Sequence, residues 1–470
     1  MTTLHYLGAL VILLCITALG LYSGSRVKSA GDFTRGGRRA GPEIVAGSII
    51  GTLVGGAATI GSAQLAFTFG FSAWWFTLGG GIGCLIFACM YAKPLYNSGI
   101  STMPETLARE YGRNVATVAM VLTSLGSFLS IVSQVLAGIA LVTSISVMPS
   151  GVATVLIIVL MLAYVLFGGV WSAGIVGIAK TILLYGAVGA CGFMALSLQG
   201  GWQAFTASLP PERFFSLFAR GLAVDMGAGL SLVIGILTTQ AYIQAMISAR
   251  SLRLAKVGVF TAAALIPPVG VAGIMVGLYM RIHAPGINPG SALPIFVLEY
   301  VHPFFGGIIL ATLLVAVVGT AAGVALGLSA MFCSDIYRVY IRPDATDAVQ
   351  LRTSRAALAV ILIAAGLVTA GNLGSLILGW SFMSMGLRGS VAFGVLTAAV
   401  FFSGRIGRNY AMASMLVGPV CILAGKPFIG NVIDPLFFGV AGSLAVLLAG
   451  YVRHRRPAAG IRDTARNKTT

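Results

Sequence analysis

Charged residues are scarce in this sequence. Its 470 residues include 29 basic and 12 acidic side chains, about 9% of the chain, while 58% are hydrophobic. Residues 44–92 and 114–179 contain no charged side chain, and each stretch is long enough for two bilayer crossings of roughly 20 residues. This balance excludes a water-soluble enzyme, a nucleic-acid-binding domain and a secreted disulfide scaffold. The sequence predicts a protein that crosses the membrane many times.

Signatures of catalysis and metal binding are also missing from the sequence. The six cysteines lie in apolar stretches, and none of them has the C-x-x-C spacing of a zinc or redox site. The chain has no H-E-x-x-H or G-x-S-x-G motif and no pair of aspartates within its apolar stretches. We therefore expect neither an enzyme nor a nucleic-acid partner, despite the net charge of +17.

Thirteen apolar stretches follow one another along the chain. They cover residues 5–23, 43–67, 73–93, 114–143, 151–167, 174–197, 226–248, 256–280, 304–333, 354–371, 378–402, 409–426 and 433–452. If the first stretch runs inward, 23 of the 29 basic residues fall on the inner side, and the outer loops hold only Arg213, Arg220, Arg281 and Lys426. Because basic loops stay in the cytoplasm, we expect an inner (plasma) membrane protein with its N-terminus outside and its C-terminus inside.

Two stretches place polar residues among glycines at mid-depth, at residues 55–64 and 235–244. Thr59 and Gln64 lie in the first, and Thr239 and Gln240 lie in the second. Paired interrupted helices are typical of transporter binding sites, where the freed backbone groups line a polar cavity. The alternative is a static bundle in which these side chains bond between helices. One such segment in each half of the chain favours a transporter, with these four residues as neutral solute ligands.

Lys180 and Arg388 are the only ionisable residues deep within the apolar stretches. Arg388 lies about ten residues into its stretch, ~15 Å at 1.5 Å per residue and close to mid-bilayer. It either caps carbonyls of a broken helix or binds an anionic solute, and its planar fork suits a carboxylate. Lys180 is ~10 Å deep and either extends to the membrane surface or takes part in transport. We predict that Arg388 binds a small carboxylate.

Short motifs along most of the chain resemble those of the bacterial sodium/solute symporters. In order, they are residues 32–42 (D-F-x-x-x-G-R-x-x-G), residues 102–107 with Tyr111-Gly112 (T-x-P-E-x-L with Y-G), Gly168-Gly169, Gln240 with Gln244, and Asp335-Ile336-Tyr337-Arg338. Their order and spacing make the resemblance specific.

The resemblance implies an all-α membrane fold with thirteen transmembrane helices and two inverted five-helix repeats, whose first and sixth core helices are broken. The chain would form a single transporter domain. Its parts would be residues 1–42 (first helix and basic loop), 43–197 (first repeat), 222–402 (second repeat), 403–452 (last two helices) and 453–470 (basic tail). The resemblance also implies sodium-coupled uptake of a small solute by alternating access, and we expect a monomer in the lipid bilayer.

A sodium site between the first and eighth core helices is a further implication of the resemblance. Ala57, Ile60 and Ala316 would supply backbone carbonyls. Gly319-Thr320 falls where the family usually has two hydroxyl residues, so Thr320 alone would supply a hydroxyl.

The coupling ion is left open by two departures from the family pattern. Gly177 falls where the family usually has an Asp, and Lys180 follows about one turn later on the same face. The alternative to Na⁺ coupling is a sodium-independent, proton-coupled or exchange transporter in which the Lys180 ammonium replaces the ion. A buried lysine loses its proton more readily than an exposed one, which would permit proton coupling. A channel and a membrane sensory module are the rival classes.

Overall fold

The computed structural model describes residues 1–25, 40–99, 102–168, 172–344, 346–429 and 433–453. Within these ranges every regular element is a helix, and the one β-type pairing is an isolated bridge between Ala40 and Ala249. Residues 32–39 of the first family motif, Gly169 and nearly all of the basic tail lie outside the described residues. The predicted all-α class is confirmed.

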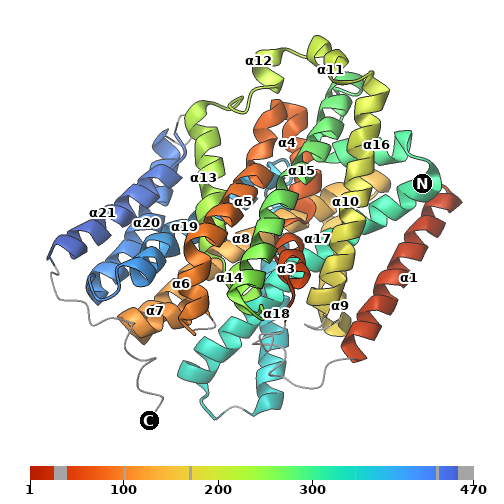
Figure 1. Ribbon diagram of the computed structural model, residues 1–470. Coiled ribbons are helices and arrows are strands. Elements are labelled where there is room, and N and C mark those ends of the chain that lie inside the picture. The colour runs from red at the N-terminus through yellow and green to blue at the C-terminus, as the bar shows by residue number, and fades with distance from the viewer. Residues whose placement is uncertain (26–39, 100–101, 169–171, 345, 430–432, 454–470) are drawn as a thin grey trace.

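Long helices form a bundle, with α1 along one edge beside α17 and α10, and with α20 and α21 at the opposite edge (Figure 1). The long helices are α1 (Thr3–Ser25), α8 (Arg113–Ile145), α9 (Ser150–Gly168), α10 (Ser172–Gln199), α13 (Leu222–Thr238), α15 (Leu252–His283), α17 (Pro303–Met331), α18 (Asp347–Ala370), α19 (Ile377–Phe401), α20 (Arg408–Ile429) and α21 (Leu436–Arg453). The shorter segments are α3 (Pro42–Leu53), η2 (Ala57–Gly61), α4 (Ser62–Phe69), η3 (Gly70–Trp74), α5 (Trp75–Ile86), η4 (Phe87–Tyr91), α6 (Ala92–Asn97), α7 (Met103–Tyr111), α11 (Trp202–Ser208), α12 (Pro211–Phe214), α14 (Gln240–Ile247), η5 (Pro289–Ser291), α16 (Ala292–Tyr300) and η6 (Phe332–Ile341).

The helices are long and apolar enough for a multi-pass membrane protein. Among the described residues, eight helices could cross a membrane by length and composition, or nine if the bent pair α13 and α14 forms one span. Each of the thirteen apolar stretches coincides with one helix or with a run of consecutive helical segments. The membrane class is therefore confirmed, whereas the count of thirteen crossings and the repeat symmetry stay predictions.

Both polar, glycine-containing segments coincide with helix breaks. Helix α3 ends at Leu53, and the chain resumes as the π-helix η2 at Ala57. Helices α13 and α14 meet at Thr239 with a bend of 49°. The first break lies close against α17, since a Cβ on Gly55 would stand 2.8 Å from the Thr320 hydroxyl. Glycine there allows the close approach, and the break leaves backbone groups free to bond with other partners.

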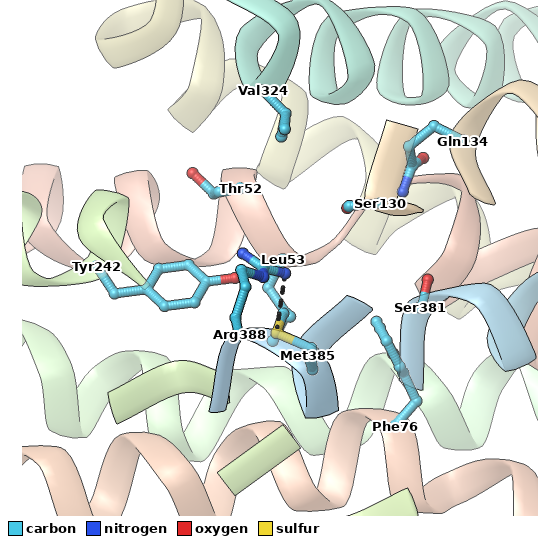
Figure 2. Close-up of a pocket in the computed structure, with 10 residues that line it drawn as sticks. All are labelled: Thr52, Leu53, Phe76, Ser130, Gln134, Tyr242, Val324, Ser381, Met385 and Arg388. Atoms are coloured by element: carbon cyan, nitrogen blue, oxygen red, sulfur yellow. Dashed lines mark hydrogen bonds between the residues drawn. The ribbon is translucent and has the colours of Figure 1, made fainter. Parts of the chain in front are cut away.

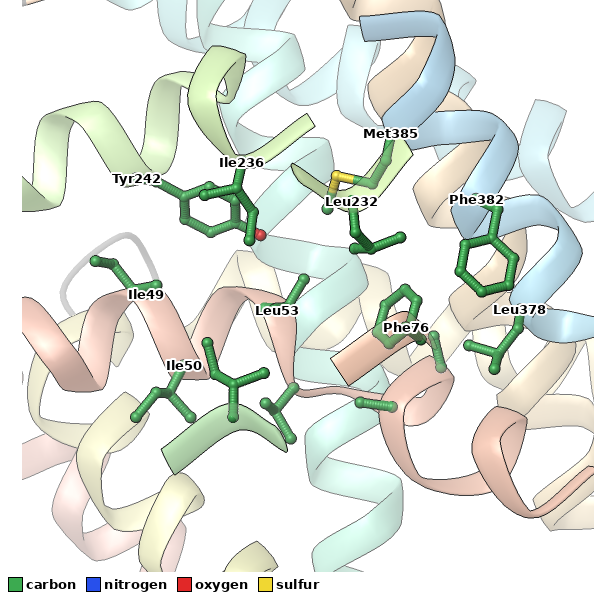
Figure 3. Packing of buried hydrophobic residues seen from close by; sticks show 14 of the residues in the cluster. Ile49, Ile50, Leu53, Phe76, Leu232, Ile236, Tyr242, Leu378, Phe382 and Met385 are labelled. Atoms are coloured by element: carbon green, nitrogen blue, oxygen red, sulfur yellow. The ribbon is translucent and has the colours of Figure 1, made fainter. Parts of the chain in front are cut away.

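Helices α5 and α13 pack along a row of glycines that we call the α5–α13 seam, formed by Gly79, Gly83 and Gly229. A Cβ on Gly79 would lie 2.9 Å from the Gly229 carbonyl oxygen, and one on Gly83 would lie 3.1 Å from the Val233 Cα. Such close approach is how membrane helices gain van der Waals contact without a hydrophobic driving force. The seam brings Phe76 of α5 into the same buried cluster as Leu232 and Met385 (Figure 3).

Candidate functional site

A small cavity lies in the middle of the bundle, and we call it the Arg388 cavity (Figure 2). Its volume is about 20 Å³ for the centre of a water-sized sphere, which is room for little more than one water molecule. In this state the cavity therefore has no room for an organic solute. Its lining comes from α3 (Thr52, Leu53), α5 (Phe76), α8 (Ser130, Gln134), α14 (Tyr242), α17 (Val324) and α19 (Ser381, Met385, Arg388).

Arg388 reaches into this cavity from α19, and its side chain is only 7% exposed. The guanidinium donates to the Thr239 hydroxyl (3.1 Å), the Ser384 carbonyl (3.2 Å) and hydroxyl (3.0 Å), and the Met385 sulfur (3.2 Å). All of these acceptors are neutral, and no Arg388 contact within the described ranges is to a carboxylate. A buried guanidinium with neutral partners has strong remaining attraction for an anion.

The five predicted solute ligands do not all meet at one place. Thr239 and Arg388 come together at the α13–α14 break. Thr59 bonds within its own segment, because its hydroxyl donates to the Gly55 carbonyl at 3.0 Å. The Gln64 carbonyl accepts from the Ile377 N–H at 2.8 Å, where α19 begins, and the Gln240 carbonyl accepts from the Met103 N–H at 2.7 Å, where α7 begins. Both glutamines therefore cap helices.

Gln134 of α8 is a polar contact that the sequence analysis did not single out. It is 3% exposed, and its side-chain oxygen accepts from the Gly56 N–H at 2.9 Å, at the break before η2. A free backbone donor in a dry interior requires such a partner. The signal in the sequence was a lone glutamine within a charge-free stretch. Gln134 also lines the cavity. Tyr242, just after the second break, was overlooked in the same way.

The Lys180 side chain ends at the first helix break. Its Nζ donates to the Thr320 hydroxyl at 2.5 Å and to the Gly51 carbonyl at 3.0 Å, and the residue is 6% exposed. Thr320 is the predicted sodium-binding hydroxyl. The other predicted sodium ligands, Ala57, Ile60 and Ala316, are all buried at 0–1% exposure. The lysine therefore bonds to one of the four predicted sodium ligands instead of extending to the membrane surface.

A second polar group, the Arg220 cluster, lies where α13 and α19 begin, and it consists of Ser72, Arg220, Asp225 and Phe382. Asp225 is fully buried and accepts from Ser72 Oγ (2.6 Å), Arg220 Nε (2.7 Å) and the Arg220 N–H (3.0 Å). The Arg220 guanidinium lies 5.4 Å from the Phe382 ring centre, and Phe382 packs edge-on against Phe76 at 5.8 Å. Because Phe76 lines the Arg388 cavity, the cluster contacts the cavity lining through Phe382.

Comparison with known proteins places these features in a wider group. The sequence profile described as "Sodium:solute symporter family" matches residues 33–418. The chain is 24% identical over 480 residues to the sodium/sialic acid symporter SiaT of Proteus mirabilis, an alignment that covers 95% of this chain and 92% of that protein. It is also 24% identical over 463 residues to the high affinity choline transporter 1 of Homo sapiens, with 91% and 78% covered.

Solved structures show the same fold. A substrate-bound, outward-open Na⁺-coupled sialic acid symporter superposes with a TM-score of 0.76 at 21% identity, over 96% of this chain and 97% of that one. A nucleobase-cation-symport-1 family transporter in a closed conformation superposes with a TM-score of 0.59 at 12% identity, over 92% and 98%. The helices described above are thus arranged as in secondary transporters.

Proposed function

The chain belongs to the sodium:solute symporter family, and from that premise we propose that it takes up a small organic anion, bound through Arg388 in the central cavity. Its relatives are transporters and not enzymes. Family membership alone does not identify the solute, because the relatives carry solutes as different as sialic acid and choline. The proposal therefore depends on the chemistry of the cavity in this chain.

The observation that supports an anion is the position of Arg388 among neutral partners. The guanidinium is 7% exposed and bonds to Thr239, Ser384 and Met385. Taking a charge out of water costs several kcal/mol unless an opposite charge compensates it. A carboxylate can accept two parallel bonds from the planar fork, and the cavity lining adds the hydroxyls of Ser130 and Tyr242 as neutral donors.

The small volume of the cavity supports a transport cycle with closed and open states. A space of about 20 Å³ cannot hold an organic anion, so the surrounding helices must move for the solute to enter. The breaks beside Gly55 and Thr239 lie next to the cavity and supply points where helix halves can change their angle. Alternating access, in which the cavity opens to one side at a time, accounts for both features.

The remaining parts of the proposal concern topology. We place thirteen crossings in the plasma membrane, with the N-terminus outside, the tail inside and a monomeric protein. The predicted halves 43–197 and 222–402 begin and end within two residues of the helix ends at Pro42, Gln199, Leu222 and Phe401. The charge asymmetry of the loops supports the orientation. The coupling ion is a separate question, because Lys180 bonds to Thr320, the hydroxyl predicted to bind sodium.

Counterflow in proteoliposomes tests the anion proposal. Vesicles loaded with one unlabelled compound from a panel of carboxylates, sugars and amino acids are mixed with a trace of the labelled compound, and accumulation of label identifies the solute. Arg388→Ala removes two charge-assisted bonds of ~1.5–3 kcal/mol each, so apparent affinity should fall by ~10² or more. Arg388→Lys keeps the charge but loses the fork, and a fall of roughly 10- to 100-fold is expected.

Arg408→Ala is the matched control, because Arg408 is exposed at the start of α20, and its uptake should equal that of the wild type. Uptake of the identified solute that is unchanged in Arg388→Ala would overturn the proposal. Conductance without saturation or counterflow would indicate a channel, and binding without transport would indicate a sensory module.

A further inference from the structure

The first core helix offers a cation position where α3 ends. In a continuous helix the Gly51 carbonyl would bond to the Gly55 N–H, but that N–H bonds to the Leu53 carbonyl at 3.2 Å. The Gly51 oxygen is thus released at the negative end of the α3 dipole. Thr320 of α17 faces the same break, since a Cβ on Gly55 would stand 2.8 Å from its hydroxyl. The two oxygens form one electronegative corner.

Lys180 fills that corner with its own charge. Its Nζ is within hydrogen-bond distance of both the Thr320 hydroxyl and the Gly51 carbonyl. Helix α10 brings Lys180 there because α10 and α3 pack closely. Gly177 of α10 faces Gly51 of α3, and a Cβ added to Gly51 would lie 3.6 Å from the Gly177 Cα. A Cβ on Gly51 or on Gly177 would only make ordinary van der Waals contact across this interface, at 3.6 and 4.0 Å.

Sodium does not fit the residues that surround this ammonium. Sodium needs several hard oxygens, which transporters supply from unwound backbone and neighbouring hydroxyls. Here Gly177 and Gly319 contribute no side-chain oxygen, and the Thr320 hydroxyl already accepts from Lys180. A second cation beside Thr320 would lie within about 4 Å of the ammonium, and at an effective dielectric of 20 the repulsion would weaken its binding by on the order of a thousandfold.

We infer that the Lys180 ammonium occupies the cation position between the broken first core helix and α17, and that this chain transports its solute without binding sodium there. The positive charge that a bound ion would contribute in each cycle is here part of the protein. A sodium gradient therefore cannot drive uptake through this position. The consequence for uptake rests on the proposed transport function, whereas the assignment of Lys180 can be tested without any solute.

Thermal unfolding of the purified protein in detergent tests the assignment with sodium alone as the probe. Melting temperatures are compared in NaCl and in KCl at equal ionic strength, because a ligand that binds only the folded protein raises Tm with its concentration. The wild type should melt at the same temperature in both salts. Lys180→Ala frees the Thr320 hydroxyl and the Gly51 carbonyl, so its Tm should rise with NaCl but not with KCl.

The exposed lysine Lys93 at the start of α6 provides the matched control, and Lys93→Ala should be as indifferent to sodium as the wild type. If Lys180→Ala does not fold, Lys180→Gln keeps a donor while removing the charge. A saturable sodium-dependent rise in the wild-type Tm would overturn the inference. A folded Lys180 variant as indifferent to sodium as the wild type would also overturn it, because the lysine would then not be what keeps sodium away.

Uptake separates this inference from the anion proposal. With the solute identified by counterflow, wild-type initial rates should agree within twofold in Na⁺ and K⁺ buffers. A tenfold dependence on Na⁺ would overturn the role of Lys180 and leave the Arg388 proposal intact. Undiminished uptake by Arg388→Ala would overturn the anion proposal and leave the Lys180 assignment intact.

Discussion

Asp225→Asn tests how strongly the Arg220 cluster stabilises the end of the bundle where α13 and α19 begin. The substitution keeps the size of the side chain and removes its charge. In the native cluster the carboxylate is fully buried and accepts from Ser72 Oγ, Arg220 Nε and the Arg220 N–H at 2.6–3.0 Å. Asparagine offers one acceptor oxygen and points its amide donors at groups that are themselves donors.

The expected loss follows from these contacts. Breaking a buried ion pair by neutralising one partner costs ~3–5 kcal/mol. The Arg220 side chain is 13% exposed, so water solvates part of the stranded guanidinium, and we expect the lower end, about 3 kcal/mol. In proteins of 150–250 residues, each kcal/mol of lost stability lowers Tm by about 2 °C or more, and the shift becomes smaller as the chain becomes longer. For this longer chain we therefore take about 2 °C per kcal/mol as the upper limit, and Tm should fall by ~3–6 °C.

The assay is thermal unfolding in detergent, combined with a double-mutant cycle. Asp225→Leu and Arg220→Met should each destabilise, but the double variant should recover most of the loss, because replacing both charges with apolar groups leaves no charge stranded. Arg213→Met, at an exposed arginine of α12, is the control and should be close to the wild type. An Asp225→Asn Tm within 1 °C of the wild type, or single-variant losses that simply add in the double variant, would refute the reasoning.

Three further predictions concern other contacts. Gln134→Leu strands the Gly56 N–H and should cost ~1–3 kcal/mol, whereas Gln134→Glu keeps an acceptor and should cost less; equal melting temperatures would contradict the capping role. Gly79→Ala should lower Tm because its Cβ would lie 2.9 Å from the Gly229 carbonyl oxygen. Gly186→Ala, in open space on α10, should raise the free energy of unfolding by ~0.5–1 kcal/mol. A Gly79→Ala variant more stable than the wild type would show that the two helices are not closely packed at the seam. Reporter fusions at the C-terminus should report a cytoplasmic location, and an external tail would contradict the loop-charge argument.

The sequence predicted the features of the site that depend on local pattern. Glycines next to polar residues indicated both helix breaks, and the depth of Arg388 in an apolar stretch indicated a buried guanidinium. Its partner Thr239 was predictable because it lies at a break. Lys180 was singled out for its depth, and its distance from the first core helix became known only from the packing of α10 against α3.

Features that depend on contacts between distant segments could not be predicted. Gln64 caps a helix 313 residues away, and Gln240 caps one 137 residues away, so neither contact leaves a periodic signal. Asp225 stands at the edge of an apolar stretch, where an acidic residue is usually solvated, and its burial depends on Arg220 and Ser72 folding over it. The sequence shows which side chains are polar, but tertiary packing decides which of them face the cavity.

The α5–α13 seam limits the ways in which the Arg388 cavity can open. Because a Cβ on Gly79 or Gly83 would already lie 2.9–3.3 Å from atoms of α13, the two helices have little room to slide past one another, and they cannot part without exposing bare backbone to lipid. Helix α19 packs against α13 just as closely, because a Cβ on Gly235 would lie 2.7 Å from the Met385 Cβ and one on Gly389 would overlap the Ile234 side chain. A motion that admits a solute is therefore easier between these three helices, which carry Arg388, and the other helices around the cavity than within the group.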